Sequence, residues 1–340
     1  MPASMWDAAA VVLKAFEYAA TLAASGAVFF LALCRRWVTT AELARIRRAM
    51  LGALLIAAAA GGARIVTTAG ALSGDAAGMM SGALLSMVWH GGLGLALTIR
   101  VASLGIATLA VRAPSPGVLG IGAAAAAATS FVWVGHARAL HAPAVPMAFE
   151  AAHLACAAFW IGSLAPLRMI VRGHAPVRAG EAVARFSAAA TLAVGALILA
   201  GAVLLGALLP GLGALWTSEY GRLVVLKLSA VACLLGLAAL NKWRWTPRLL
   251  GADAGAARAA ALALSTSIAA EMVVAALVLL ATATFTTITG PPDSAMLRPI
   301  DAKPGSCAGT GITITGPPQS GLQSCSSAVL ARYVCEPSRS

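Results

Sequence analysis

Eight long apolar segments determine what this chain can fold into. An α-helix rises 1.5 Å per residue, so about 20 apolar residues are needed to cross the roughly 30 Å hydrocarbon core of a bilayer. The segments long enough to do so are Ala8–Leu33, Ala49–Leu72, Gly94–Val111, Gly117–Gly135, Met147–Ile170, Phe186–Leu209, Gly221–Leu240 and Ala261–Thr284. We therefore predict an all-α fold, a polytopic membrane bundle of about eight transmembrane helices. The apolar stretch Gly78–His90 is predicted to be a partly embedded periplasmic helix.

The composition agrees with this prediction and excludes a soluble fold. Sixty per cent of the 340 residues are hydrophobic and only 11% are charged, whereas a soluble domain carries about 25% charged residues. Too little polar surface is left to cover one or two globular domains. The net charge of +12 would suggest a nucleic-acid partner only if the basic residues lay on one face of a soluble module. We therefore predict that the partner is the lipid bilayer and that no nucleic acid is bound.

The basic residues predict the orientation of the chain. Fourteen of the 24 Lys and Arg residues lie in the first, third, fifth and seventh connections between the apolar segments, and the other connections are nearly free of them. These fourteen are Arg35, Arg36, Arg45, Arg47, Arg48, Arg112, Arg168, Arg172, Arg178, Arg185, Lys242, Arg244, Arg248 and Arg258. Cytoplasmic loops carry an excess of Lys and Arg, so both termini are predicted to be periplasmic, in a bacterial inner membrane. No charged region precedes the first segment, which is therefore predicted to be a retained helix.

The end of the chain differs from the rest. We predict a membrane domain over residues 1–292 and a periplasmic tail over residues 293–340, which is rich in Ser, Gly and Pro. The tail holds Cys307, Cys325 and Cys335 and repeats the string TITGPP of Thr287–Pro292 at Thr313–Pro318. Its composition favours a disordered extension. An alternative is a tail that gathers metal through its cysteines.

Several charged residues lie inside the apolar segments, where a charge costs at least about 2.5–3.5 kcal/mol. Lys14 and Glu17 are three residues apart and are predicted to pair locally. Lys227 lies near enough to the outer surface for its side chain to reach it. Glu271, near the middle of the last segment, has two interpretations: it neutralises a basic residue on another helix, or it lines a path for cations.

Four of the five histidines are predicted to lie near the periplasmic surface. His136 ends the fourth segment, His141 follows it, His153 lies near the start of the fifth, and His90 precedes the third. Glu150 is three residues before His153, with Met147 one turn outward and Cys156 one turn inward. Imidazole suits Cu(II), and thioether and thiol groups suit Cu(I), so these residues predict a copper site without deciding its oxidation state. The alternative is that interfacial histidines only bind lipid headgroups and helix ends, which we prefer for His141.

Several strings resemble the bacterial copper resistance protein D family. They are EAAHLACAAFWIGSLAPL at Glu150–Leu167, GHA at Gly135–Ala137, RFS at Arg185–Ser187, EYGRLVVLKLSAVACLLGLAALN at Glu219–Asn241, PRL at Pro247–Leu249, and Glu271 in the last segment. The resemblance covers about residues 10–292 and is strongest over 135–292. Ser163 stands where the family pattern has the second glycine of a pair, next to Gly162 and close to Trp160, which we expect to be packing residues.

The resemblance implies an inner-membrane protein that moves copper or supports copper handling, with a separate periplasmic copper-binding partner of the C type. Copper would be the transported substrate, carried from periplasm to cytoplasm, and the family-matched positions His136, Glu150 and His153 would be outer ligands. The clustering of polar groups at one face adds Met147 to this site, and Cys156, Met169 and Glu271 are the deeper residues that would relay the ion inward. Two alternatives remain: a membrane copper-binding or assembly partner that does not transport, and a haem or electron-transfer protein. No motif typical of an enzyme is present, so we predict no enzymatic activity.

Overall fold

The computed structural model describes residues 5–135, 143–208, 213–217, 219–251 and 253–288. The chain divides into two units, Met1–Arg298 and Pro299–Ser340. All of the second unit lies outside the described residues, so the predicted tail and its cysteines stay a prediction. Within the described residues the secondary structure is helical throughout, and no strand occurs.

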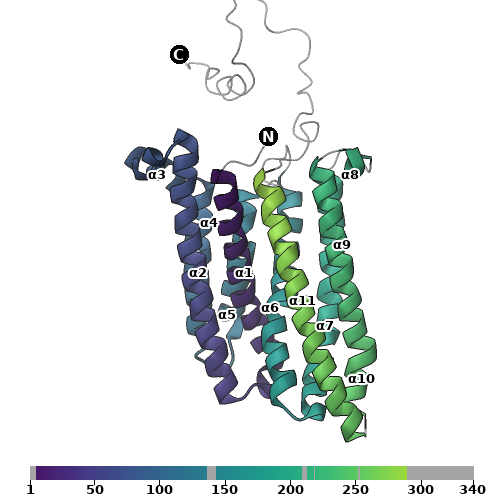
Figure 1. Ribbon diagram of the computed structural model, residues 1–340. Helices are drawn as coiled ribbons and strands as arrows, with labels where there is room; N and C mark the ends of the chain where they lie inside the picture. The colour runs from purple at the N-terminus through teal and green to yellow at the C-terminus, as the bar shows by residue number, and fades with distance from the viewer. Residues whose placement is uncertain (1–4, 136–142, 209–212, 218, 252, 289–340) are drawn as a thin grey trace, which may run out of the picture. The chain divides into compact units, whose positions relative to one another are not determined.

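Eight helical spans are long and apolar enough to cross a membrane, which confirms the predicted fold class. They are formed by α1 (Met5–Cys34), α2 (Thr40–Ser73), α4 (Gly92–Ala110), α5 (Gly117–Thr129), α6 (Ala144–Gly173), α7 (Pro176–Leu208), α9 (Glu219–Leu240) and α11 (Ala254–Ile288). Shorter helices connect or extend them: α3 (Gly82–Trp89), α8 (Ala214–Thr217), α10 (Thr246–Leu249), the 3-10 turns Arg35–Trp37, Ala76–Met80 and Ser130–Val134, and a π-helical turn at Asn241–Trp245. Figure 1 shows the long helices side by side, with α3 and α8 at the end where α1 begins.

Local sequence signals set the helix boundaries. The helix α2 begins with a capping box, in which the Thr39 hydroxyl accepts from the Glu42 backbone N–H and the Glu42 carboxylate accepts from the Thr39 N–H. It ends at Gly74, which has a φ of 81°. The predicted helix at Gly78–His90 is present as a 3-10 turn followed by α3. The fourth span is α-helical only to Thr129 and then continues as a 3-10 turn.

The first helix lies at the centre of the bundle. It packs against α2, α4, α5, α6, α7 and α11, and residues such as Ala24, Val28 and Phe30 are completely buried. In contrast, α7 and α9 expose large apolar side chains, including Leu192 and Leu226. Because an apolar surface of this kind is stable in lipid but not in water, the protein is a multi-pass membrane protein.

Two glycines allow α1 and α6 to approach closely. A β-carbon at Gly26 would overlap with the Ala158 carbonyl oxygen and the Gly162 backbone, and one at Gly162 would overlap with the Leu22 carbonyl oxygen. Ser163, the departure from the family pattern, is fully buried at the same crossing and donates its hydroxyl to the Gly26 carbonyl at 3.3 Å. Small residues at this crossing therefore allow backbone-to-backbone packing, as in other membrane helix pairs.

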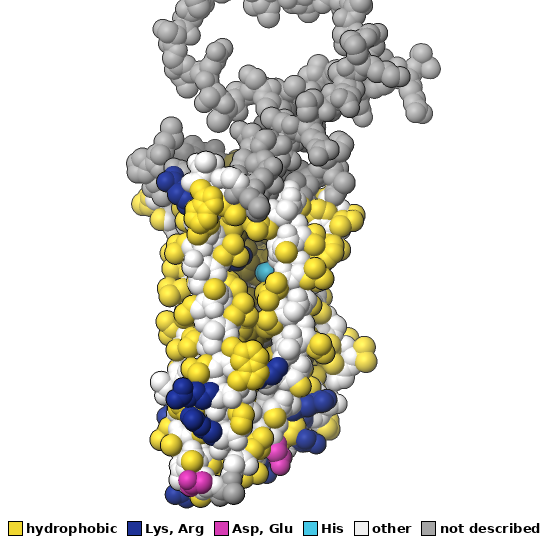
Figure 2. Space-filling model, turned by 90° about the vertical axis from the view of Figure 1, so that its right-hand side faces the viewer, with side chains coloured by type: hydrophobic (Ala, Val, Ile, Leu, Met, Phe, Trp, Pro, Cys, Tyr) yellow, Lys and Arg dark blue, Asp and Glu magenta, His cyan; other side chains and the backbone are white. Residues whose placement is uncertain are grey.

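The two ends of the bundle differ in charge. We call the end where α1 begins the N-terminal end, and the end where α1 leads into α2 the basic end. The loops and helix termini at the basic end carry Arg35, Arg36, Arg112 and Arg178, and Figure 2 shows Lys and Arg side chains gathered there on one face. An excess of arginine at one end of the bundle is the feature from which the orientation of a membrane protein is inferred.

Candidate metal site

The predicted ligands Glu150 and His153 lie together in the part of α6 near the N-terminal end. They are three residues apart on one helix, so their side chains leave α6 on adjacent positions. The Glu150 carboxylate lies against the backbone of Gly135, where a β-carbon would overlap with both of its oxygens. Its Oε2 atom is buried and has no hydrogen-bond partner among the described residues. A buried carboxylate oxygen without a partner is costly, and such a group is a candidate ligand for a cation.

The imidazole of His153 is oriented by the neighbouring helix α7. Its Nδ1 atom lies 3.1 Å from the Leu197 carbonyl oxygen. A carbonyl can only accept, so Nδ1 carries a proton, and in the neutral imidazole Nε2 keeps its lone pair. Gly201 is one turn further along α7, and a β-carbon there would lie 3.3 Å from the His153 Cε1 atom. This is the arrangement typical of a metal-binding histidine, whose second nitrogen is fixed by a backbone carbonyl.

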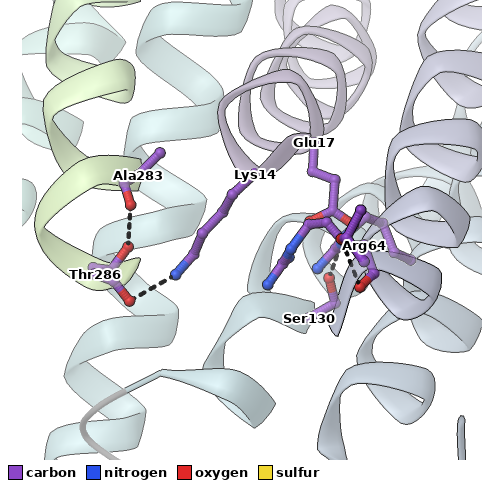
Figure 3. Close-up of polar contacts among 8 residues, drawn as sticks. Lys14, Glu17, Arg64, Ser130, Ala283 and Thr286 are labelled. Atoms are coloured by element: carbon purple, nitrogen blue, oxygen red, sulfur yellow. Dashed lines mark hydrogen bonds and ion pairs between the residues drawn. The ribbon is translucent and has the colours of Figure 1, made fainter. Parts of the chain in front are cut away.

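Two lysines from other helices surround this pair with positive charge. Lys14 of α1 and Lys227 of α9 lie within electrostatic reach of the Glu150 carboxylate. Lys14 donates its Nζ–H to the Thr286 carbonyl oxygen of α11 at 3.1 Å, as Figure 3 shows. The Lys227 Nζ lies 5.1 Å from the ring centroid of Phe285, also on α11. Both lysines that act electrostatically on Glu150 therefore also contact α11.

The face on which α9 lies is hollowed towards the N-terminal end. Figure 2 shows this hollow bordered by hydrophobic side chains, with a histidine side chain visible inside it. Polar groups thus reach into an otherwise apolar region of the bundle, which is the usual character of a binding site.

The structure places the other predicted ligands as follows. Met147 is one turn before Glu150 on α6. Cys156 instead lines an apolar groove with Phe29 and Phe159. His90 is exposed at the end of α3, where its Nδ1 lies 2.8 Å from the Ser86 carbonyl oxygen.

The remaining predicted ligands, His136 and His141, lie outside the residues that the structure describes. Within the described part of the chain, no group of three His, Cys, Asp or Glu side chains is close enough to hold a metal ion.

The two candidate relay residues lie elsewhere in the bundle. Met169 lines a cleft at the basic end. Glu271 is buried in α11 and accepts a hydrogen bond from the Asn241 side chain amide. The partner of Glu271 is therefore a neutral amide. The sequence-based interpretations had included only a basic partner on another helix or a place in a cation path. Asn241 begins the π-helical turn that follows α9, and a π turn within a helix often occurs at a functional position.

A buried charge network next to the site was not predicted from the sequence. Glu17 forms ion pairs with Arg64 of α2 and with Arg100 of α4, the second at 2.9 Å. Arg100 also donates its Nε–H to the Ser130 hydroxyl at 3.1 Å and stacks on Phe131, with its guanidinium 3.7 Å from the ring centroid. The predicted local pair between Lys14 and Glu17 is replaced by these contacts, because the two side chains point towards different helices (Figure 3).

Comparison with known proteins gives two family matches. The family model described as copper resistance protein D-like, N-terminal domain, matches residues 5–144, and the model described as copper resistance protein D matches residues 180–285. No curated protein and no solved structure matches the chain significantly. The N-terminal match includes the helices that carry Glu17, Arg64 and Arg100, and the second match includes those that carry Lys227 and Glu271. Glu150 and His153 lie between the two matched ranges.

Proposed function

The chain belongs to the copper resistance protein D family, and we propose that it carries copper ions across the inner membrane of a bacterium. Membership of this family supports a role in copper resistance and homeostasis. The finer proposal is that copper enters at the N-terminal end, binds at Glu150 and His153, and leaves at the basic end. Arginine-rich loops face the cytoplasm in most membrane proteins, so this direction is uptake from the periplasm.

One observation supports the entry site most directly: the buried Oε2 atom of Glu150 has no partner among the described residues. A carboxylate oxygen in that state gains a ligand when a cation binds. The Nε2 lone pair of His153 supplies a second, nitrogen ligand on the same helix. Met147 and His136 are the proposed remaining ligands. The proposed source of the ion is a separate periplasmic copper-binding protein of the C type.

The lysines explain how such a site would release its ion. A transported ion must bind strongly enough to enter and weakly enough to leave. Lys14 and Lys227 place positive charge near Glu150, which attracts the empty carboxylate and repels a bound cation. We propose that the lysines keep copper binding at this site moderate, and that the protein acts as a carrier and not as an enzyme.

Copper uptake into liposomes tests this proposal. We expect the double variant Glu150→Ala/His153→Ala to lower the initial uptake rate by at least about 10-fold, because losing even the outer-shell partner of a metal ligand typically costs 10–100-fold in metal affinity. The comparison variant is His90→Ala. The sequence alone also predicted this histidine as a ligand, but it is exposed at the end of α3, with its Nδ1 2.8 Å from the Ser86 carbonyl oxygen, so its removal is expected to keep the wild-type rate. Size-exclusion profiles establish that all variants are folded. Wild-type uptake by the double variant would contradict the assigned site.

A second candidate function is a copper-binding partner that does not transport. It is favoured by the state of the deeper carboxylates, because Glu271 is bonded to Asn241 and Glu17 is paired with two arginines. These acidic side chains already have partners and are not free to relay an ion. Stoichiometric copper binding that is lost in the double variant, without any flux in the wild type, would establish this second function.

A further inference from the structure

A cleft at the basic end lies apart from the proposed copper entry site, although it contains Met169, one of the residues predicted to relay the ion. It has a volume of about 370 Å³ and is formed by three helices. The residues that matter here are Glu42 and Arg45 of α2, Arg168, Met169 and Arg172 of α6, and Met272 of α11. The cleft is far along α6 from Glu150, so it is a separate feature of the bundle.

The cleft carries positive charge that is not neutralised by its own residues. Its single carboxylate, Glu42, already accepts from the Thr39 N–H at 2.8 Å and lies 3.0 Å from the His174 Nε2. Arg168 donates its Nε–H to the Ser265 carbonyl oxygen at 3.0 Å, and its terminal N–H groups have no hydrogen bond to another described residue. Among the ion pairs of the described residues, none includes Arg45, Arg168 or Arg172. Three arginines therefore line a cleft whose one carboxylate, that of Glu42, already has partners.

The cleft is charged at its rim and apolar further in. Arg172 lies in the last turn of α6 and Arg45 in the second turn of α2, and both are exposed. Met272 lies seven residues beyond Ser265 on α11, which corresponds to roughly 10 Å along the helix axis towards the middle of the bundle. Met169 lies on α6 at a depth between the exposed arginines at the rim and Met272. A ligand that fills the cleft must therefore combine an anionic head with an apolar part.

We propose that this cleft binds an anionic phospholipid, with its phosphate between the arginines and the start of an acyl chain along Met169 and Met272. Guanidinium groups bind phosphate oxygens through paired hydrogen bonds, and basic pockets between membrane helices on the cytoplasmic side commonly hold anionic headgroups. A free phosphate ion shares the head chemistry but would leave the apolar part of the cleft without a contact. The lipid is therefore the ligand to which the cleft is matched.

Native mass spectrometry of the full-length protein in detergent, with added dioctanoyl phosphatidylglycerol, tests the proposal. The variant Arg45→Gln/Arg172→Gln removes two charges from the cleft. The matched control, Arg48→Gln/Arg258→Gln, removes two exposed arginines that do not line it. We expect the cleft variant to weaken lipid binding by about 10-fold and the control by less than about 2-fold, because each basic residue near an anionic headgroup contributes substantially to its attraction.

The other outcomes would overturn the proposal. An equal loss of lipid binding in both variants would show a general attraction of anionic lipid to the basic end. No phosphatidylglycerol binding to the wild-type protein would show that the cleft does not hold this class of lipid. Displacement of the lipid by an equal concentration of inorganic phosphate would show that the cleft recognises the free anion. Because the cleft variants leave Glu150 and His153 unchanged, none of these results depends on the copper proposal.

Discussion

Glu17→Ala is expected to destabilise the bundle by about 3–5 kcal/mol, the usual cost of removing one partner from a buried ion pair. Glu17 is the carboxylate for both Arg64 and Arg100, and Glu17 and Arg100 are completely buried. Without it, two guanidinium groups would remain inside the protein with no opposite charge from α1. We expect the midpoint of thermal unfolding in detergent to fall by about 10 °C.

Two further variants separate charge from packing. Glu181→Ala removes a carboxylate that is exposed on α7 and accepts from the Trp37 Nε1 at 3.3 Å, and it is expected to shift the midpoint by less than about 2 °C. Replacing Glu17, Arg64 and Arg100 together by methionine is expected to recover most of the loss, since an apolar replacement of a whole buried ion pair is often neutral. A wild-type midpoint for Glu17→Ala would show that the arginines are neutralised in another way.

Gly162→Leu is expected to have the second largest effect on folding. A side chain at this position has no space, because even a β-carbon would overlap with the Leu22 carbonyl oxygen of α1. The two helices would have to separate, and Ser163 would lose its hydrogen bond to the Gly26 carbonyl. Overpacking of this kind typically costs about 1–3 kcal/mol and more where backbone atoms are in contact. We expect most of the variant to run as aggregate in size-exclusion chromatography after mild detergent extraction.

Gly195→Leu is the control for that experiment. Gly195 lies in the span formed by α7, and a β-carbon there would meet nothing within 4 Å. The added side chain would extend into lipid, where leucine is favourable, so the control is expected to elute as the wild type does. If both glycine variants elute normally, the close contact between α1 and α6 does not determine the stability of the fold.

The sequence predicted the spans well because their signal is local. The length and apolar character of each segment decide whether it can cross a bilayer, and eight spans are present as predicted. The pairing of the charged side chains was predicted less well, because their partners are distant in sequence. Lys14 and Glu17 are close enough on one helix to pair, yet Lys14 reaches α11 and Glu17 reaches α2 and α4.

In the candidate site too, the features set within one helix were predicted from the sequence, and the contacts between helices were not. The spacing of Glu150 and His153 was sufficient to place them on adjacent positions of one helix. Cys156 is six residues from Glu150, and at 3.6 residues per turn it points about 120° away, into the apolar groove with Phe159. The Leu197 carbonyl and Lys227 come from other helices. The spacing of residues within α6 does not indicate these two neighbours, because their positions depend on how α6, α7 and α9 pack together.

The ion pairs of Glu17 have a consequence for how the protein is made. The carboxylate is synthesised 47 residues before Arg64 and 83 residues before Arg100. During that interval the first helix carries a charge that is costly in hydrocarbon, and each arginine carries the same disadvantage when its own helix emerges. The three helices are therefore more stable in lipid as a group than singly. We expect the N-terminal half to reach its final stability only when α4 has left the ribosome and Glu17 has both arginines as partners.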